Sequence, residues 1–292
     1  MSARGAGTPV PSPHRARRRE KKTATCLGAL AVLLGWAGPA AARASTAAGP
    51  PTQPAPSSLA VATSGNWSGY IATGTSYTEA SGAFDVPNVS RYVTGSTASE
   101  WVGIDGWSNS TLVQAGVNEI PLGHGATLVE PWWEVVPGPQ ELATGMMVRA
   151  GDRIKAQVEE VSAGRWSISL VDDTNGDSFS TVQPYAGPAS SAEWVVEADA
   201  TTSGVPTRLA PLGDKITFVH MAVNDALASP EGTLEAGVEP GAANSPTEKG
   251  LSHPTTFTEV VMVQSGNAVS TPSPLRKGEF SVTYGGAHGL ND

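Results

Sequence analysis

Four short segments combine carboxylic acid, amide and indole side chains, and none of them contains lysine or arginine. They span residues 101–105, 112–118, 130–136 and 192–197. Carboxyl groups that lie close together without cations raise one another's pKa, and a carboxyl group with a raised pKa can carry protons in catalysis. These segments are therefore suited to general acid–base chemistry.

Strand geometry divides each segment into two faces, because alternate side chains of an extended strand point in opposite directions. One face of each segment is apolar, as with Val102 and Ile104 or Val113 and Val117. The other faces carry Trp101, Asp105, Gln114, Asn118, Glu130, Trp132, Glu134, Glu193 and Glu197. If the four strands are neighbours in one sheet, these side chains form a single groove. The alternative is an ordinary solvated face, which normally includes lysine and threonine.

The rest of the chain after residue 66 predicts an all-β protein. Short alternating or apolar runs are broken by Gly, Pro, Asn and Asp about every ten residues, and no long helical period is present. The predicted strands are 67–73, 82–86, 98–104, 111–117, 126–135, 153–161, 166–172, 178–182, 192–198, 215–223, 258–263 and 279–284. A dozen short strands indicate an antiparallel β-sandwich of two sheets. We expect the Gly-, Pro- and Ala-rich segment 224–256 to be a long loop.

The N-terminal residues predict export. Residues 1–44 contain a basic stretch, an apolar run over 24–37 and the small-x-small sequence Ala-Arg-Ala at 42–44, as in a signal peptide cleaved between Ala44 and Ser45. A membrane anchor is the alternative, but the apolar run is shorter than the roughly 20 residues that span a bilayer. We therefore expect a secreted protein with a disordered linker or short pro-segment at 45–63 and one folded domain at 64–292.

Charge and cysteine content exclude several functions. The first 44 residues hold 8 of the 18 Lys and Arg residues and one of the 27 acids, so the remainder has 10 bases, 26 acids and a net charge of −16. This charge argues against nucleic-acid binding and against stable association with anionic membranes. Cys26 is the only cysteine and lies in the apolar run. The mature chain therefore has no disulfide, cysteine nucleophile or cysteine metal ligand.

Six motifs in chain order resemble the glutamic endopeptidases, the eqolisin (peptidase G1) family of acid proteases. They are Gly-Asn-Trp-Ser-Gly-Tyr at 65–70, Gly-Ala-Phe-Asp-Val-Pro at 82–87, Trp-Val-Gly-Ile-Asp-Gly at 101–106, Val-Gln-Ala-Gly-Val at 113–117, Trp-Trp-Glu at 132–134 and Ala-Glu-Trp-Val-Val-Glu at 192–197, and Gly-Glu-Phe-Ser-Val-Thr-Tyr follows at 278–284. The resemblance implies a sandwich of two bent sheets, similar to concanavalin or a jelly roll, that acts on polypeptides in acid without metal or cofactor. We expect it to be a monomer.

The resemblance also assigns roles to individual residues. It implies that Gln114 and Glu193 are the catalytic pair and that Trp101, Asp105, Trp132 and Glu134 line the substrate groove, to which strand alternation adds Glu130 and Glu197. Glu193 would serve as base and then acid, and Gln114 would stabilise the oxyanion. Two positions depart from the family pattern, where Asn118 replaces an expected aspartate and Val136 an expected tyrosine.

The same residues leave other functions open. Paired carboxylates with tryptophan also suit a carbohydrate-binding sandwich or a glycoside hydrolase, in which Glu134 and Glu193 would be the catalytic acids. A serine hydrolase is disfavoured because the chain has no Gly-x-Ser-x-Gly sequence, and metal-dependent hydrolysis because it has no His-Glu-x-x-His sequence. A non-catalytic binding module would keep the sandwich but would not need Gln114 paired with Glu193.

Overall fold

The computed structural model describes residues 59–200, 205–213, 215–228, 235–236 and 255–285. The predicted signal peptide lies outside these residues, as does the predicted linker up to residue 58. Every regular element in the described part is a β-strand. No helix there is long and apolar enough to span a membrane.

The first sheet holds the four segments with the unusual side chains. Its strands, in spatial order, are β1 (Ala60–Ser64), β16 (Thr256–Gln264), β2 (Trp67–Thr73), β11 (Ser191–Glu197), β4 (Ser96–Ile104), β5 (Leu112–Gly123), β6 (Ala126–Val136) and β7 (Glu141–Leu142). Neighbours are antiparallel except for β1 and β16. The short β12 (Arg208–Leu209) also pairs in parallel with the start of β4.

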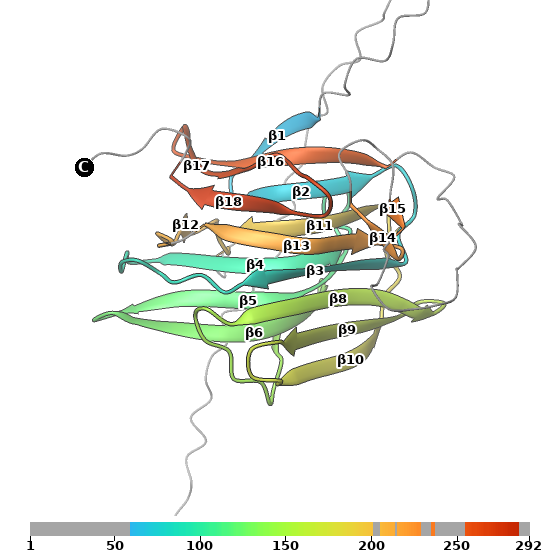
Figure 1. Ribbon diagram of the computed structural model, residues 1–292, viewed down its shortest axis with the longest axis horizontal. Helices are drawn as coiled ribbons and strands as arrows, with labels where there is room; N and C mark the ends of the chain where they lie inside the picture. Colours follow the sequence, from blue (N-terminus) through green and yellow to red (C-terminus); the bar gives the residue numbers. More distant parts are fainter. Residues whose placement is uncertain (1–58, 201–204, 214, 229–234, 237–254, 286–292) are drawn as a thin grey trace, which may run out of the picture.

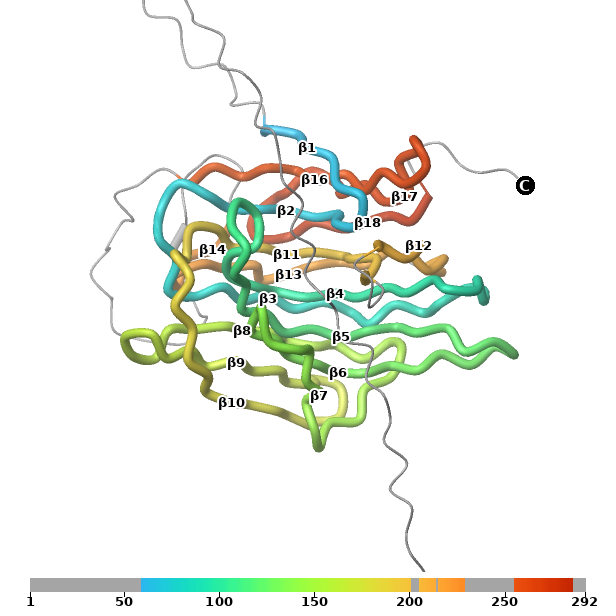
Figure 2. Tube along the Cα trace, turned by 180° about the vertical axis from the view of Figure 1, so that it is seen from behind, coloured from blue at the N-terminus to red at the C-terminus, as the bar shows by residue number. Residues whose placement is uncertain are grey.

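The second sheet is antiparallel throughout. Its order is β17 (Asn267–Pro272), β18 (Phe280–Tyr284), β13 (Ile216–Val223), β3 (Glu79–Asp85), β8 (Arg153–Ser162), β9 (Arg165–Asp172) and β10 (Ser178–Pro184), with β14 (Ala226–Leu227) and β15 (Glu235–Ala236) added beside β13. The pairing of β16 with β17 joins the two sheets at one edge. Figures 1 and 2 show this edge from opposite sides, with β1, β16 and β17 together at the top.

The two sheets enclose one apolar core, which makes the fold a β-sandwich. Val102 and Val113 of the first sheet are fully buried in the same cluster as Phe84 and Phe218 of the second. The indole N–H of Trp194 crosses from β11 to donate a hydrogen bond to the carbonyl of Ser81 in β3. The predicted fold class is therefore confirmed, and so is the prediction that the apolar faces of the four segments point into the core.

All twelve predicted strands are present, and the departures have local causes. β5 continues to Gly123, because its hairpin with β6 extends past the predicted end at 117. The sequence gives no strong signal for β1 (Ala-Val-Ala-Thr-Ser) or for β17, which is polar and ends in proline. Both segments form strands because they pair with β16. β1 begins at Ala60, within the predicted linker, and β14 and β15 lie within the predicted loop at 224–256.

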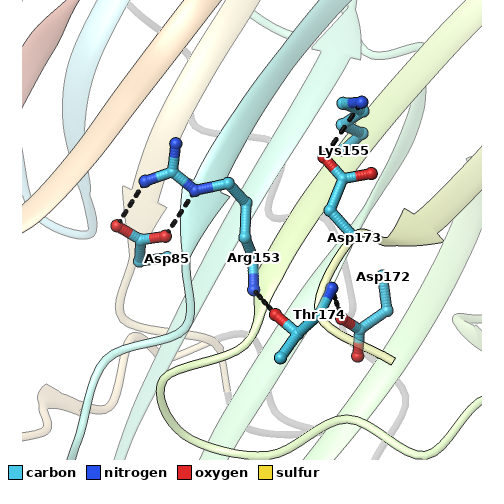
Figure 3. Close-up of polar contacts among 6 residues, drawn as sticks. All are labelled: Asp85, Arg153, Lys155, Asp172, Asp173 and Thr174. Carbon is cyan, nitrogen blue, oxygen red and sulfur yellow. Dashed lines mark hydrogen bonds and ion pairs between the residues drawn. The ribbon is translucent and has the colours of Figure 1, made fainter. Parts of the chain in front are cut away.

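The outer face of the second sheet carries ordinary ion pairs. Arg153 binds Asp85 through two hydrogen bonds of 2.8 Å, and Lys155 lies 2.9 Å from Asp173 (Figure 3). These side chains are partly exposed, so each pair contributes little to stability. The first sheet differs, because β2, β4, β5, β6 and β11 contain no lysine or arginine.

Two glutamates of the first sheet point into the core, which the sequence analysis did not anticipate. Glu100 in β4 and Glu119 in β5 are both fully buried. They lie beside one another, and among the residues that the structure describes no other group forms a hydrogen bond with either carboxyl. Burial raises the pKa of Glu100 to about 8, and burial together with Glu100 raises the pKa of Glu119 well above its ordinary value. Both side chains are therefore neutral in the folded protein at acidic pH.

This pair predicts that the fold loses stability as the pH rises. The ordinary pKa of a glutamate is 4.5, so between about pH 4.5 and 8 the folded state binds more protons than the unfolded state. The free energy of unfolding should fall across this window, by at most about 1.4 kcal/mol per pH unit for each such proton. Chemical denaturation at pH 4, 6 and 8 measures this slope.

Replacing Glu100 with Gln should make that slope shallower, because the neutral amide does not titrate. Glu159→Gln, an exposed position on β8, is the matched control and should keep the wild-type slope. Equal slopes in Glu100→Gln and wild type would show that Glu100 does not control the pH dependence.

Candidate functional site

The chemistry-bearing side chains of the first sheet lie in one row across four strands. Glu193 of β11 is opposite Gly103 of β4, Gly103 is opposite Gln114 of β5, and Gln114 is opposite Glu134 of β6. Directly opposed residues of paired strands point to the same face. The register therefore places Glu193, Gln114 and Glu134 on the face that points away from the core.

Gly103 contributes no side chain of its own between Glu193 and Gln114, and the Trp101 ring packs close to it. A Cβ atom at this position would lie 3.1 Å from Cβ of Gln114 and 3.0 Å from Cζ3 of Trp101. Because neighbouring strands are about 4.8 Å apart, the Cα atoms of Glu193 and Gln114 are about 10 Å apart. The two side chains therefore flank Gly103 on the same face of the sheet.

Gln114 is held by Glu134, but much of the row lacks hydrogen-bond partners. The amide Nε2 of Gln114 donates a 2.8 Å hydrogen bond to Oε2 of Glu134. The row also contains buried oxygens with no hydrogen-bond partner in the described part of the chain, namely Oε1 of Gln114, Oε1 of Glu134 and both carboxyl oxygens of Glu193. Buried polar atoms are nearly always hydrogen-bonded in folded proteins, so unpaired ones gathered together indicate a place for water or a ligand.

The two carboxyl groups of the row have raised pKa values because they are buried. Glu193 is fully buried, which raises its pKa well above the ordinary value, and the nearby Asp105 raises it further. The hydroxyl of Ser191, two residues earlier on the same face, acts in the opposite direction. Burial also raises the pKa of Glu134 to about 7. Both groups therefore hold their protons to higher pH than an exposed glutamate does, which is a property common at functional sites.

Two tryptophans lie in the next row. Trp101 is opposite Val195 on one side and Gly116 on the other, and Gly116 is opposite Trp132. A Cβ at Gly116 would come within 2.6 Å of Cβ of Trp101, so glycine is required there. Both indoles are buried, and they belong to a second apolar cluster that is separate from the core.

Glu197 and Glu130 lie at the far end of the same face. Glu197 is opposite Ser99, Ser99 is opposite Asn118, and Asn118 is opposite Glu130. Both oxygens of Glu197 accept hydrogen bonds, from Trp101 at 2.9 Å and from Asn66 at 2.8 Å. Burial and Asp199 raise the pKa of Glu197 to about 8. Glu130 is only partly buried, and Asn118 donates a hydrogen bond to Gln140.

Asp105 lies just beyond the end of β4 and is fully buried. Its carboxylate accepts five hydrogen bonds from the protein itself, including those from Tyr185, Ser190 and Asn109. The structure thus brings Gln114, Glu134 and Glu193 into one row, sets Trp101, Trp132, Glu130 and Glu197 along the same face, and engages Asp105 elsewhere.

Sequence reasoning missed several residues that shape this site. Gly103 and Gly116 interrupt predicted strands, and glycine inside a strand is a signal for close approach of other groups. Ser191 shares the alternation of Glu193 but precedes the predicted strand start. The described residues contain no group of three or more His, Cys, Asp or Glu side chains arranged to hold a metal ion.

The chain matches the model of the Peptidase A4 family over residues 65–271. It is 31% identical over 160 residues to aspergillopepsin-2 of Aspergillus niger, which covers 46% of this chain and 56% of that protein. It is 30% identical over 139 residues to scytalidopepsin B of Scytalidium lignicola, covering 45% and 51% respectively. The chain thus spans about half the length of these two relatives.

Solved structures give the same result for the fold. A scytalido-glutamic peptidase with a peptide-based transition-state analogue superposes with a TM-score of 0.57 at 19% identity, covering 75% of this chain and 98% of that one. An eqolisin-family peptidase in complex with the tripeptide Ala-Ile-His has a TM-score of 0.53 at 18% identity, with the same coverage. The family model covers most of the described sandwich, including all four strands of the site, and the chain therefore belongs to the Peptidase A4 family.

Proposed function

We propose that this protein is an endopeptidase that hydrolyses peptide bonds in acid with Glu193 and Gln114 as its catalytic pair. The observation that carries the proposal is the row in which these residues flank Gly103, with unpaired oxygens on both of them. Membership of the Peptidase A4 family supports peptide substrates over the carbohydrate alternative.

Glu193 supplies the proton transfers in this mechanism. Its ionised form, which the raised pKa makes the minor form in acid, accepts a proton from a water molecule as the water oxygen forms a bond to the peptide carbonyl carbon. It then donates that proton to the amide nitrogen as the carbon–nitrogen bond breaks, and a carboxylic acid and an amine are released. A raised pKa makes Glu193 a stronger base than an exposed glutamate and keeps its proton transferable.

Gln114 stabilises the charge that develops on the carbonyl oxygen. One N–H of its amide is bound by Glu134, which fixes the orientation of the group, and the second N–H remains for the oxyanion. An amide that is fixed before the reaction costs no reorganisation when the charge appears. Glu134 thus acts on catalysis through Gln114.

The remaining residues of the face are proposed to bind substrate. Glu130 is the most accessible acid and suits contacts with an extended peptide, while Trp101, Trp132 and Glu197 form the apolar and hydrogen-bonded floor. Glu193 and Gln114 are at most 5% exposed, so a substrate has to displace the side chains that cover them. One structurally similar peptidase has been solved with a tripeptide, which supports peptides as the ligands of this fold.

The setting of the enzyme follows from the same proposal. We propose that it is secreted after cleavage near Ala44 and acts as a monomer without a metal or other cofactor. The acid-protonated core pair of Glu100 and Glu119 suits a protein that works outside the cell in acid.

The first experiment compares wild type with Glu193→Gln and Gln114→Ala. Cleavage of an unfolded protein substrate at acidic pH is followed by the appearance of internal fragments. We expect Glu193→Gln to lose about 10²- to 10⁴-fold in kcat and Gln114→Ala about 10²- to 10³-fold. Glu141→Gln, an exposed position on β7, is the control and should retain activity. Full activity in a folded variant of either Glu193 or Gln114 would refute the mechanism.

A second experiment tests the role of Glu134. Its pKa of about 7 means that a negative charge develops beside Gln114 as the pH rises through neutrality, and this charge opposes the oxyanion. We expect wild-type kcat to fall near pH 7 and the Glu134→Gln variant to lack this step. Short assays, with near-ultraviolet circular dichroism to confirm folding at each pH, separate this effect from loss of the fold. An identical step in folded Glu134→Gln would exclude Glu134 as its origin.

A further inference from the structure

Asp105 occupies the point where the first sheet meets the connection that leads into the Glu193 strand. It follows the last residue of β4, with φ of +71°, and its backbone N–H donates a 2.9 Å hydrogen bond to the carbonyl of Ser191. Asp105 is two residues after Gly103, and Ser191 is two residues before Glu193. The hydrogen bond between Asp105 and Ser191 therefore lies at the end of the β4–β11 pairing in which Glu193 is opposite Gly103.

The Asp105 carboxylate is fully used by hydrogen bonds within the protein. Oδ2 accepts from the hydroxyl of Tyr185 at 2.5 Å and from the backbone N–H of Ala189 at 2.8 Å. Oδ1 accepts from the backbone N–H of Ser190 at 2.8 Å, its hydroxyl at 3.1 Å and Nδ2 of Asn109 at 2.9 Å. Two carboxylate oxygens offer about four lone-pair sites, so no acceptor is left for a substrate.

Four of the five donors belong to residues 185–190, the connection between β10 and β11. This connection packs closely against the carboxylate. A Cβ atom at Gly187 would lie 2.6 Å from Oδ2 of Asp105 and 2.0 Å from the hydroxyl oxygen of Tyr185. Ala189 adopts a positive φ of 50°, and its carbonyl accepts a hydrogen bond from Tyr77. These contacts thus fix the backbone of residues 185–190 around the Asp105 carboxylate. The position of this backbone determines where β11 begins.

Asp105 also influences Glu193 electrostatically. Its negative charge is among the causes that raise the pKa of Glu193, after the larger effect of burial. The other titratable groups that interact with Glu193 are Tyr77 and Tyr185, which are neutral at acidic pH. Within the described residues, Asp105 is thus the charged group that raises the pKa of Glu193.

We propose that Asp105 is a positioning residue that sets the place of Glu193 and does not contact substrate. This rests on the proposed role of Glu193. It assigns Asp105 a different task from the groove contact implied by the family resemblance. The same carboxylate fixes Ser190, which lines an open depression of about 560 Å³ together with Gly74, Thr75 and Ser76.

The test is Asp105→Asn, measured as kcat and KM on a peptide substrate across the acidic pH range. The amide has the same shape but loses acceptor capacity and charge. We expect kcat to fall about 10- to 100-fold, since displacement of a catalytic group by about 1 Å has effects of this size. KM should stay within about threefold of wild type. The transition in the pH profile that reports Glu193 should move to lower pH, because a negative charge has been removed beside it.

Gly187→Ala is the matched variant, because it disturbs the same connection but keeps the Asp105 charge. It should lower kcat without moving the Glu193 transition to lower pH. Tyr185→Phe removes only the hydroxyl that donates to Asp105 and to Thr111, and it tests the positioning role if Asp105→Asn does not fold. Its kcat should fall less than tenfold with KM unchanged.

The outcomes separate this proposal from the proposed function. A large rise in KM with unchanged kcat in Asp105→Asn or Tyr185→Phe would show that this carboxylate contacts substrate, which overturns the inference. Wild-type kcat and pH profile in both variants would do the same. If Glu193→Gln is inactive while these variants behave as wild type, only the positioning role fails. If Glu193→Gln is fully active, the proposed function itself fails.

Discussion

The whole site depends on the register between β11, β4, β5 and β6. This register aligns Glu193, Gly103, Gln114 and Glu134 in a single row. A shift of one residue in any of these strands would turn its polar side chains into the core and its apolar ones outward. The apolar core therefore protects the geometry of the site, because the burial of residues such as Val102 and Val113 holds the register that the opposite face uses.

The first sheet also buries several glutamates in strands that contain no lysine or arginine. Glu100 and Glu119 point into the core, while Glu134, Glu193 and Glu197 lie on the opposite face of the same sheet. Burial raises the pKa in every case. Acidic conditions thus suit both faces of the first sheet. On the core face, protonation removes buried charge. On the site face, the glutamates can exchange protons. The ion pairs found among the described residues lie on the other sheet, where solvent screens them.

Much of the site was predictable from strand alternation alone. The pattern sorted Val102 from Trp101 and Trp194 from Glu193 correctly, because a strand has a side-chain period of two whatever its neighbours are. The same rule places Glu100 on the core face, where a glutamate without a cation is rare. Alternation also put Asp105 on the site face, although the chain leaves the strand at Ile104 and turns through a positive φ.

The sequence by itself determined the all-β class, the two faces of each strand and, through family resemblance, the pairing of Gln114 with Glu193. These depend on local periodicity and on short motifs. Only the tertiary structure decided which strands are neighbours, that Gly103 separates the pair and that the carboxylate of Asp105 is occupied by residues 185–190. The physical reason is that strand neighbours and hydrogen-bond partners are set by contacts between residues about 80 positions apart in the chain, as with Asp105 and Tyr185, which no local pattern encodes.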